Sequence, residues 1–398
     1  MSAGRVYLDH AATTPVLSEV IDVVAARMRA PGNPSSLHGS GRAARKGVEE
    51  ARESVAAALG AQPSEVVFTS GGTEADNLAV KGLYWARRAA DPRRIRVLVS
   101  SVEHHAVADP AEWLGKAEGA QVEWLPVDGD GRLVVDELRA AVARDPDSVA
   151  LVSVMWANNE VGTLQPIAEV LAAASRHGIP VHSDAVQAVG SVAVDFAASR
   201  LAAMTVSGHK LGGPVGSGAL LVQRDADLVP VLHGGGHERE IRSGTLDAAS
   251  IAGFSAAVSA AVLNRADHTR RIGELREALV RGVLDAVPDA VVNGPADPRR
   301  RLPGIAHLSF PGCEGDAMMM LLDAQGIDCS TGAACAAGVP EPSHVLLAMG
   351  ADPLLARGSL RFSLGRTSTR ADVDALVAAI GPVAQRARAA GYMNVRGS

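Results

Sequence analysis

The sequence has 398 residues, of which 47% are hydrophobic and 21% are charged. This composition supplies enough apolar surface for one large α/β domain or for two domains, and it excludes a disordered chain. The formal net charge of −6 provides no basic surface for nucleic acid, and we find neither a secretory signal nor an apolar run of membrane-spanning length. We therefore expect a cytoplasmic protein without nucleic-acid or membrane partners.

The N-terminal part of the chain predicts two helices separated by a loop. Residues 5–15 are typical of a short extended segment, and residues 16–29 have helical spacing. Residues 31–41 are rich in turn formers and predict a surface loop, which a helix from about residue 42 to residue 59 follows.

Residues 65–80 form the first unit that points to a function. A β-rich run ending at Ser70 is followed by Gly71, Gly72 and Thr73, and then by a helix that begins near Glu74. A strand, a glycine turn and a helix N-terminus direct free backbone N–H groups at an anion, so this unit predicts a phosphate site. It matches neither a Walker A loop nor the glycine pattern of dinucleotide-binding folds. The alternative is a tight turn with Thr73 as the helix cap.

Polar residues also come at the ends of the next three apolar runs, which begin near residues 95, 149 and 179. Strands and helices alternate from residue 65 to residue 225, which predicts a parallel sheet with right-handed crossovers. Ligands collect at the carboxyl edge of such a sheet, so we expect these polar side chains there. They are His104, His105, Asn158, Asp184 and Gln187.

Two of these positions support more specific expectations. Adjacent residues of an extended segment point to opposite sides, so only one of His104 and His105 should face a site, and a paired-histidine metal site is disfavoured. The carboxylate of Asp184 lies among apolar neighbours and would be costly without a cation. That cation could be an arginine or the protonated ring nitrogen of a pyridoxal cofactor.

A glycine-rich stretch over residues 207–218 contains Ser207, His209 and Lys210. A lysine that forms an imine needs a shaped, partly desolvated pocket, and glycines let the backbone approach a ligand closely. A solvated lysine in a flexible loop is the alternative. Together with the phosphate turn, a histidine and Asp184, however, Lys210 completes the set of groups that pyridoxal phosphate requires.

The pattern changes after about residue 262. We expect a long helix over 264–287, strands over 306–310 and 326–329, and helices over 342–349 and 371–388, with fraying from Gly391 onward. Met318, Met319 and Met320 should fill a core, and a metal site at the two histidines of residues 233–237 is disfavoured because carboxylate and thiolate ligands are missing nearby.

The three cysteines, Cys313, Cys329 and Cys335, are too few and too unevenly placed for a disulfide framework. Cys335 lies among small residues and glycines that favour a mobile loop. From the residues alone, a buried structural cysteine is the commoner reading, with a nucleophilic thiol as the alternative. Cys329 is expected to be a buried strand residue.

The ordered motifs of the chain resemble those of cysteine desulfurases of the NifS/IscS type, within the class V aminotransferase superfamily, with greatest similarity to actinobacterial housekeeping forms. The resemblance implies a fold-type I pyridoxal phosphate enzyme. Its large α/β domain would span residues 16–262 around a mostly parallel seven-stranded sheet, and residues 1–15 and 263–398 would form a smaller α+β domain. The motifs lie at residues 7–15, 71–78, 103–107, 158–167, 182–190, 207–218, 234–246 and 329–349.

The resemblance also implies roles around the cofactor ring. Lys210 matches the lysine that holds pyridoxal 5'-phosphate covalently, His104 the histidine that stacks on the ring and assists proton transfer, and Asp184 the partner of the ring nitrogen. Gln187 matches a contact to the ring O3′, and Asn158 an amide near the ring oxygen and the substrate carboxylate.

Further matches concern the phosphate, the substrate and a second subunit. Thr245 matches a phosphate contact given to the partner subunit, which implies a homodimer with shared sites. Arg361 matches the arginine that binds the substrate α-carboxylate, and Cys335 matches the cysteine that accepts sulfur as a persulfide. The residues that match phosphate contacts within one subunit are Gly72, Thr73, Ser207 and His209.

The implied reaction converts L-cysteine to L-alanine and supplies sulfur to an iron–sulfur scaffold, a tRNA-thiolation protein or another acceptor, with no metal in the site. Ala334 and Ala336 flank Cys335, whereas many relatives have hydroxyl residues in this motif. The identity of the sulfur acceptor is therefore left open. A selenocysteine lyase or an aminotransferase is the runner-up, and a non-catalytic platform for a sulfur-relay partner is the third possibility.

Overall fold

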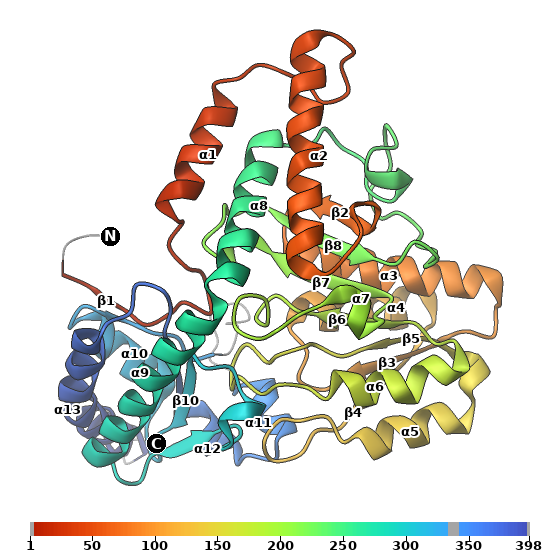
Figure 1. Cartoon of the computed structure of the whole chain (residues 1–398). Helices are drawn as coiled ribbons and strands as arrows, with labels where there is room; N and C mark the ends of the chain where they lie inside the picture. The colour runs from red at the N-terminus through yellow and green to blue at the C-terminus, as the bar shows by residue number, and fades with distance from the viewer. Residues whose placement is uncertain (1–3, 333–341, 396–398) are drawn as a thin grey trace.

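The computed structural model describes residues 4–332 and 342–395 (Figure 1). Its centre is a seven-stranded sheet with the order β2-β8-β7-β6-β5-β3-β4. Only β8 runs antiparallel to its neighbours, so the sheet is mostly parallel, as predicted. The strands are β2 (Val66–Thr69), β3 (Arg96–Ser100), β4 (Gln121–Leu125), β5 (Val149–Ser153), β6 (Val181–Asp184), β7 (Ala203–Ser207) and β8 (Gly218–Val222).

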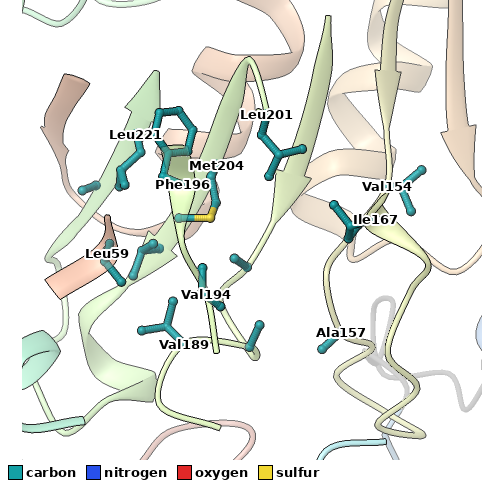
Figure 2. Close-up of a cluster of buried hydrophobic side chains, with 14 of the residues drawn as sticks. Leu59, Val154, Ala157, Ile167, Val189, Val194, Phe196, Leu201, Met204 and Leu221 are labelled. Carbon is teal, nitrogen blue, oxygen red and sulfur yellow. The ribbon is translucent and has the colours of Figure 1, made fainter. Parts of the chain in front are cut away.

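Apolar side chains cover both faces of this sheet. Leu220 and Leu221 are adjacent and fully buried, yet they belong to two different apolar clusters, because successive strand residues point to opposite faces. Figure 2 shows part of the larger cluster, in which Met204 and Leu221 of the sheet lie close to Phe196. The helices of this part are α1 (Ser18–Met28), α2 (Gly39–Leu59), α3 (Gly72–Ala90), α4 (His105–Glu118), α5 (Val135–Arg144), α6 (Ile167–Ala174), α7 (Phe196–Ser199) and α8 (Ala248–Leu263).

A third apolar cluster forms around a three-stranded antiparallel sheet at one end of the molecule (Figure 1). The chain's first strand, β1 (Val6–Tyr7), pairs in parallel with β11 (Ile327–Asp328) and so joins this C-terminal part. The exact division between the two domains stays a prediction. The remaining elements are β9 (Val291–Asn293), β10 (Ile305–Ser309), β12 (Ser359–Ser363), α9 (Arg265–Ala286), α10 (Gly315–Asp323), α11 (His344–Ala348), α12 (Pro353–Arg357) and α13 (Arg370–Val395).

Three local expectations were wrong. Helix α3 begins at Gly72 with Gly71 as its N-cap, so Thr73 lies inside the first turn and does not cap it. Helix α13 continues to Val395, beyond the expected end at residue 388. Met318 is fully buried, but Met320 is 68% exposed, because adjacent positions of α10 cannot all face the core.

The N-terminal segment crosses from the small sheet to the large one. Asp9 forms a parallel bridge with Ser363, and the N–H group of Thr14 donates to the carbonyl of His209 at 3.1 Å. Residues 9–14 therefore lie where the carboxyl ends of the large sheet's strands meet the small sheet. Within the described part of the chain, no helix is both long enough and apolar enough to cross a membrane.

Candidate active site

A cavity of about 390 Å³ lies at this junction. Strand ends, the first turn of α3 and the small sheet all contribute to its wall, as expected for the carboxyl edge of a parallel sheet. Nine of the predicted site residues line it: Gly72, Thr73, His104, Asp184, Gln187, Ser207, His209, Lys210 and Arg361.

Lys210 occupies the short helical turn that follows β7. Its Nζ atom donates hydrogen bonds to the carbonyls of Ala11 and Ala12 at 2.6 and 2.8 Å. Burial, followed by the positive charge of Arg361, lowers the pKa of Lys210 to about 8. A substantial fraction of the amine is therefore neutral near pH 8, which suits a lysine that acts as a nucleophile or a base.

Asp184 is the last residue of β6 and is only 7% exposed. Its Oδ1 atom accepts the N–H group of Val186 at 2.8 Å. Burial, followed by the charge of Asp76, raises the pKa of Asp184 to about 7. The described residues provide no ion pair for this carboxylate, so the cavity retains a place for a cationic group of a ligand.

His104 is the N-cap of α4, and its Nδ1 atom accepts the N–H group of Ala106 at 3.1 Å. The ring proton of the neutral side chain therefore lies on Nε2. Burial, followed by the charge of Lys210, lowers the pKa of His104 to about 4, so the ring is neutral at pH 7. The expectation that only one histidine of the pair faces the site was wrong: His105 also lines the cavity, because the helix begins there and the segment is not extended.

The first turn of α3 has no side-chain cap, so its N–H groups point to the cavity without a capping partner from the described residues. Gly71 precedes it with φ 144°, a conformation that favours glycine. Gly218 of β8 packs against this turn so closely that a Cβ atom there would lie 2.9 Å from the Cα atom of Gly71. Ser207 lies beside this turn, since a Cβ atom at Gly72 would be 3.6 Å from its Cβ atom. His209 also lines the cavity, and its Nδ1 atom lies 3.2 Å from the Oγ1 atom of Thr13. This uncapped helix end fits a phosphate group.

Arg361 extends from β12 into the other side of the cavity. Its Nη1 atom donates to the carbonyl of Asn159 at 3.0 Å, and its Nη2 atom donates to Asp9 at 2.8 Å. Its Nε atom is buried without a partner within the described residues. The guanidinium group is thus held rigidly and retains an unused donor for an acidic ligand.

Of the other three predicted site residues, the two that the structure describes do not line the cavity. Asn158 is fully buried, and its side chain binds backbone groups: Nδ2 donates to the carbonyl of Val102, and Oδ1 accepts the N–H groups of Glu160 and Val161. Thr245 is exposed to solvent in the single chain. Cys335 falls outside the described residues. The roles predicted for these three residues stay predictions.

The model of the family described as aminotransferase class-V matches residues 6–376. An IscS-like cysteine desulfurase of Mycobacterium tuberculosis is 58% identical over 385 residues, which cover 96% of this chain and 98% of that protein. The chain belongs to the cysteine desulfurases of the NifS/IscS type. The predicted family and fold class are therefore confirmed.

Two solved structures have a similar fold. A structure titled NifS-like protein has a TM-score of 0.88 and 34% identity, with 96% of this chain and all of that chain covered. A structure titled SspA in complex with cysteine has a TM-score of 0.77 and 30% identity, with 91% of this chain and 99% of that chain covered.

The sequence did not single out several residues that line this desulfurase-type cavity. Glu160 follows the two asparagines after β5, is 3% exposed and accepts a hydrogen bond from Ser343. Burial raises the pKa of Glu160 to about 7. Asp76 and His344 also line the cavity. Glu160 could have been predicted from its position shortly after a buried strand, two residues beyond Asn158.

Among the described residues, no group of three or more histidine, cysteine, aspartate or glutamate side chains is arranged to hold a metal ion. The Nδ1 atom of His237 accepts the N–H group of Gly244 at 3.3 Å, and its Nε2 atom lies 3.2 Å from the Oγ atom of Ser35.

Proposed function

We propose that the chain is a pyridoxal phosphate-dependent enzyme that converts L-cysteine to L-alanine and leaves the substrate sulfur as a persulfide on Cys335. The observation that carries this proposal is the convergence, in one cavity of a desulfurase-family chain, of Lys210, Asp184, Arg361 and the uncapped N-terminus of α3. In the overall reaction, the carbon–sulfur bond of cysteine breaks and a sulfur–sulfur bond to Cys335 forms. The thiol proton stays with the products, so no external oxidant or reductant is required.

The residues present fit the cofactor. The N–H groups at the start of α3, with Ser207 and His209, would hold its phosphate, and the carboxylate of Asp184 would face a protonated ring nitrogen. Pyridoxal phosphate, when bound, supplies an electron sink that labilises the bonds at the Cα atom of an amino acid.

Residues of the chain account for the remaining requirements. Arg361 binds the α-carboxylate of cysteine, which orients the Cα–H bond toward Lys210. Lys210, with its pKa lowered to about 8, takes and returns the Cα proton. Neutral His104 carries a proton on Nε2 that it can donate within the cavity.

Chain connectivity supports the role of Cys335. Gly332 and His344 flank the segment that contains it, and both line the cavity. Cys335 follows Gly332 by three residues, a span that reaches about 11 Å at most. We further propose that a homodimer forms, in which Thr245 contacts the phosphate of the partner's site, and that an iron–sulfur scaffold or another acceptor protein takes the sulfur.

The test measures alanine and sulfide released from L-cysteine in the presence of a thiol reductant and pyridoxal phosphate. The unmodified protein should release both in equal amounts, and Cys335→Ala should keep the bound cofactor but lose both products. Cys329→Ala serves as the matched control and should retain activity. Full alanine production by Cys335→Ala would contradict the persulfide, and cofactor binding without any alanine would contradict cysteine as the substrate.

A further inference from the structure

The loop that carries Thr245 is fixed to its own subunit more firmly than an exposed loop requires. Residues 238, 239 and 240 all have positive φ angles, of 40°, 59° and 62°, although none is glycine. Such conformations are costly for residues with a Cβ atom and persist only where the surroundings enforce them. Two ion pairs provide this constraint.

The first ion pair joins Glu238 to Arg52 of α2. The Glu238 carboxylate accepts two hydrogen bonds from the Arg52 guanidinium, at 2.6 and 2.8 Å, and a third from the N–H group of Phe68 in β2, at 2.8 Å. The side chains of Glu238 and Arg52 are only 2% and 11% exposed. The loop is therefore fastened to the edge strand that leads into the phosphate turn.

The second ion pair joins Arg242 to Glu74 in the first turn of α3. The Arg242 Nε atom donates to Glu74 Oε1 at 2.7 Å, and Glu74 Oε2 accepts the N–H group of Ser70 at 2.7 Å. Both side chains are 17% exposed. Burial alone would raise the pKa of Glu74, but the hydrogen bonds from Arg242 and Ser70 outweigh it and lower that pKa, so the pair is charged at neutral pH.

This second pair connects two structures that serve different sites. Glu74 braces the Ser70–Gly72 turn, which faces the cavity of its own subunit. Arg242 precedes Thr245 by three residues, and Thr245 is exposed and contributes nothing to that cavity. A loop held so tightly, with Thr245 exposed and outside its own cavity, suits the presentation of Thr245 to another molecule.

We infer that Glu74 and Arg242 are positioning residues that set the Thr245 segment of one subunit for the cofactor phosphate of the other. This inference rests on the proposed function, specifically on the shared site of a homodimer. One ion pair then aligns both phosphate contacts of the dimer: the subunit's own turn and the threonine that it gives to its partner. Loss of Arg242 in one subunit should therefore weaken cofactor binding in the other subunit.

Mixed dimers test this directly. One subunit carries Lys210→Ala, which removes its covalent link to pyridoxal phosphate, so the visible absorbance of covalently bound cofactor reports only the native site of the other subunit. Arg242→Met is placed either in the Lys210→Ala subunit or in the subunit with the native lysine. The dissociation constant of pyridoxal phosphate is measured by titration of the cofactor-free dimer.

Arg242→Met in the Lys210→Ala subunit should raise the dissociation constant at the native site by about fivefold or more, as expected for loss of a charge-assisted pair. Thr245→Ala in the same subunit should produce a similar rise, and the two changes together should not add. Arg239→Met, which alters an exposed arginine of the same loop, is the matched control and should have no effect. Glu74→Gln keeps an acceptor for Ser70 but removes the charge, and should reproduce the effect of Arg242→Met.

The outcomes separate this inference from the proposed function. If Arg242→Met acts only on the site of its own subunit, or on neither site, the positioning role is wrong while the desulfurase proposal stands. If Thr245→Ala has no effect across the dimer, or if the protein is a monomer, the shared site is wrong and the inference falls with it. A general folding defect would weaken both placements of Arg242→Met and would also lower the melting temperature of the mixed dimer well below that of the Arg239→Met dimer, and such a result overturns the inference.

Discussion

Arg361 donates a hydrogen bond to Asp9 at 2.8 Å, although 352 residues separate them in the chain. The pair joins β12 of the small sheet to the N-terminal segment, next to the carbonyls that hold Lys210. The Arg361 side chain is 5% exposed and that of Asp9 is 21% exposed, so their attraction is weakly screened. The arginine is thus aligned before any substrate carboxylate arrives.

Arg361→Lys should raise the KM for L-cysteine about tenfold or more and change kcat much less, because lysine cannot reproduce a guanidinium's paired hydrogen bonds to a carboxylate. Steady-state alanine production measures both constants. Arg370→Lys, in an exposed ion pair with Asp374, is the control and should leave both unchanged. A kcat that falls while KM stays constant would show that Arg361 does not bind the ground-state substrate.

Asp9→Asn should change the KM for L-cysteine in the opposite direction. Asparagine keeps an oxygen that can accept from Arg361 but removes the charge that competes with the substrate carboxylate. The KM for L-cysteine should therefore fall, by about two- to fivefold, the range of a partly exposed ion pair. An increase in KM in the same assay would mean that alignment by Asp9 matters more than competition.

The contact between Arg361 and Asp9 illustrates what the sequence could not predict. The strand–turn–helix unit at residues 65–80 was correct because its signals are local: an apolar run, two glycines and a helical pattern. The convergence of Asp184 and Lys210 was also predictable, since the carboxyl ends of parallel strands share one edge. By contrast, the partners of Arg361 depend on how the small sheet packs against the N-terminal segment and the large sheet, and no periodicity in the sequence records that.

Helix boundaries were a second source of error. His105 was expected to face away from the site, yet it lines the cavity because α4 begins at that residue. One residue's change from extended to helical backbone redirects the side chain by a large angle. Thr73 was offered as a possible cap on similar local grounds, but Gly71, with φ 144°, is the N-cap, so the helix starts two residues earlier than expected. Propensity fixes the existence of a helix better than its first residue.

Gly218→Ala should weaken binding of pyridoxal phosphate, by about fivefold to a hundredfold, because overpacking at this strand costs about 1–3 kcal/mol. The new Cβ atom would lie 2.7 Å from the carbonyl oxygen of Val206 and 2.9 Å from the Cα atom of Gly71, so the phosphate turn must shift. Titration of the cofactor-free protein measures the affinity. Gly129→Ala, which meets no atom within 4 Å, is the matched control. A lower melting temperature with unchanged affinity would contradict a role in shaping the turn.

Asp184→Asn should raise the thermal stability of the cofactor-free protein and weaken its binding of the cofactor. Folding raises the pKa of this carboxyl from 3.8 to about 7, so the folded state binds more protons between these values and loses stability as pH rises through that range. Asparagine removes this cost. The cofactor-free variant should therefore melt at a higher temperature than the unmodified protein at pH 8, with little difference at pH 4.

The same substitution should weaken pyridoxal phosphate binding about tenfold or more, because the ring nitrogen loses its anionic partner. Differential scanning calorimetry of the cofactor-free proteins and a cofactor titration at pH 8 provide the two measurements. Equal melting temperatures at pH 8 would show that the charge of Asp184 is compensated without the cofactor. Ser183→Ala, at the adjacent buried position of β6, controls for a general disturbance of the strand.

Cys329 should react far more slowly than an exposed thiol. Burial, followed by the charges of Asp9 and Asp328, raises its pKa from 9.0 to about 12, so at pH 8 the thiolate fraction is about a thousandfold smaller than that of an ordinary cysteine. Brief treatment of the folded protein with iodoacetamide at pH 8, followed by peptide mass spectrometry, should therefore leave Cys329 unmodified, as it should Cys313, whose thiol pKa burial also raises. Both should react fully in urea. Alkylation of folded Cys329 at the rate of free cysteine would contradict this shielding. The residue was expected to be a buried strand residue, but it is partly buried and follows β11 directly.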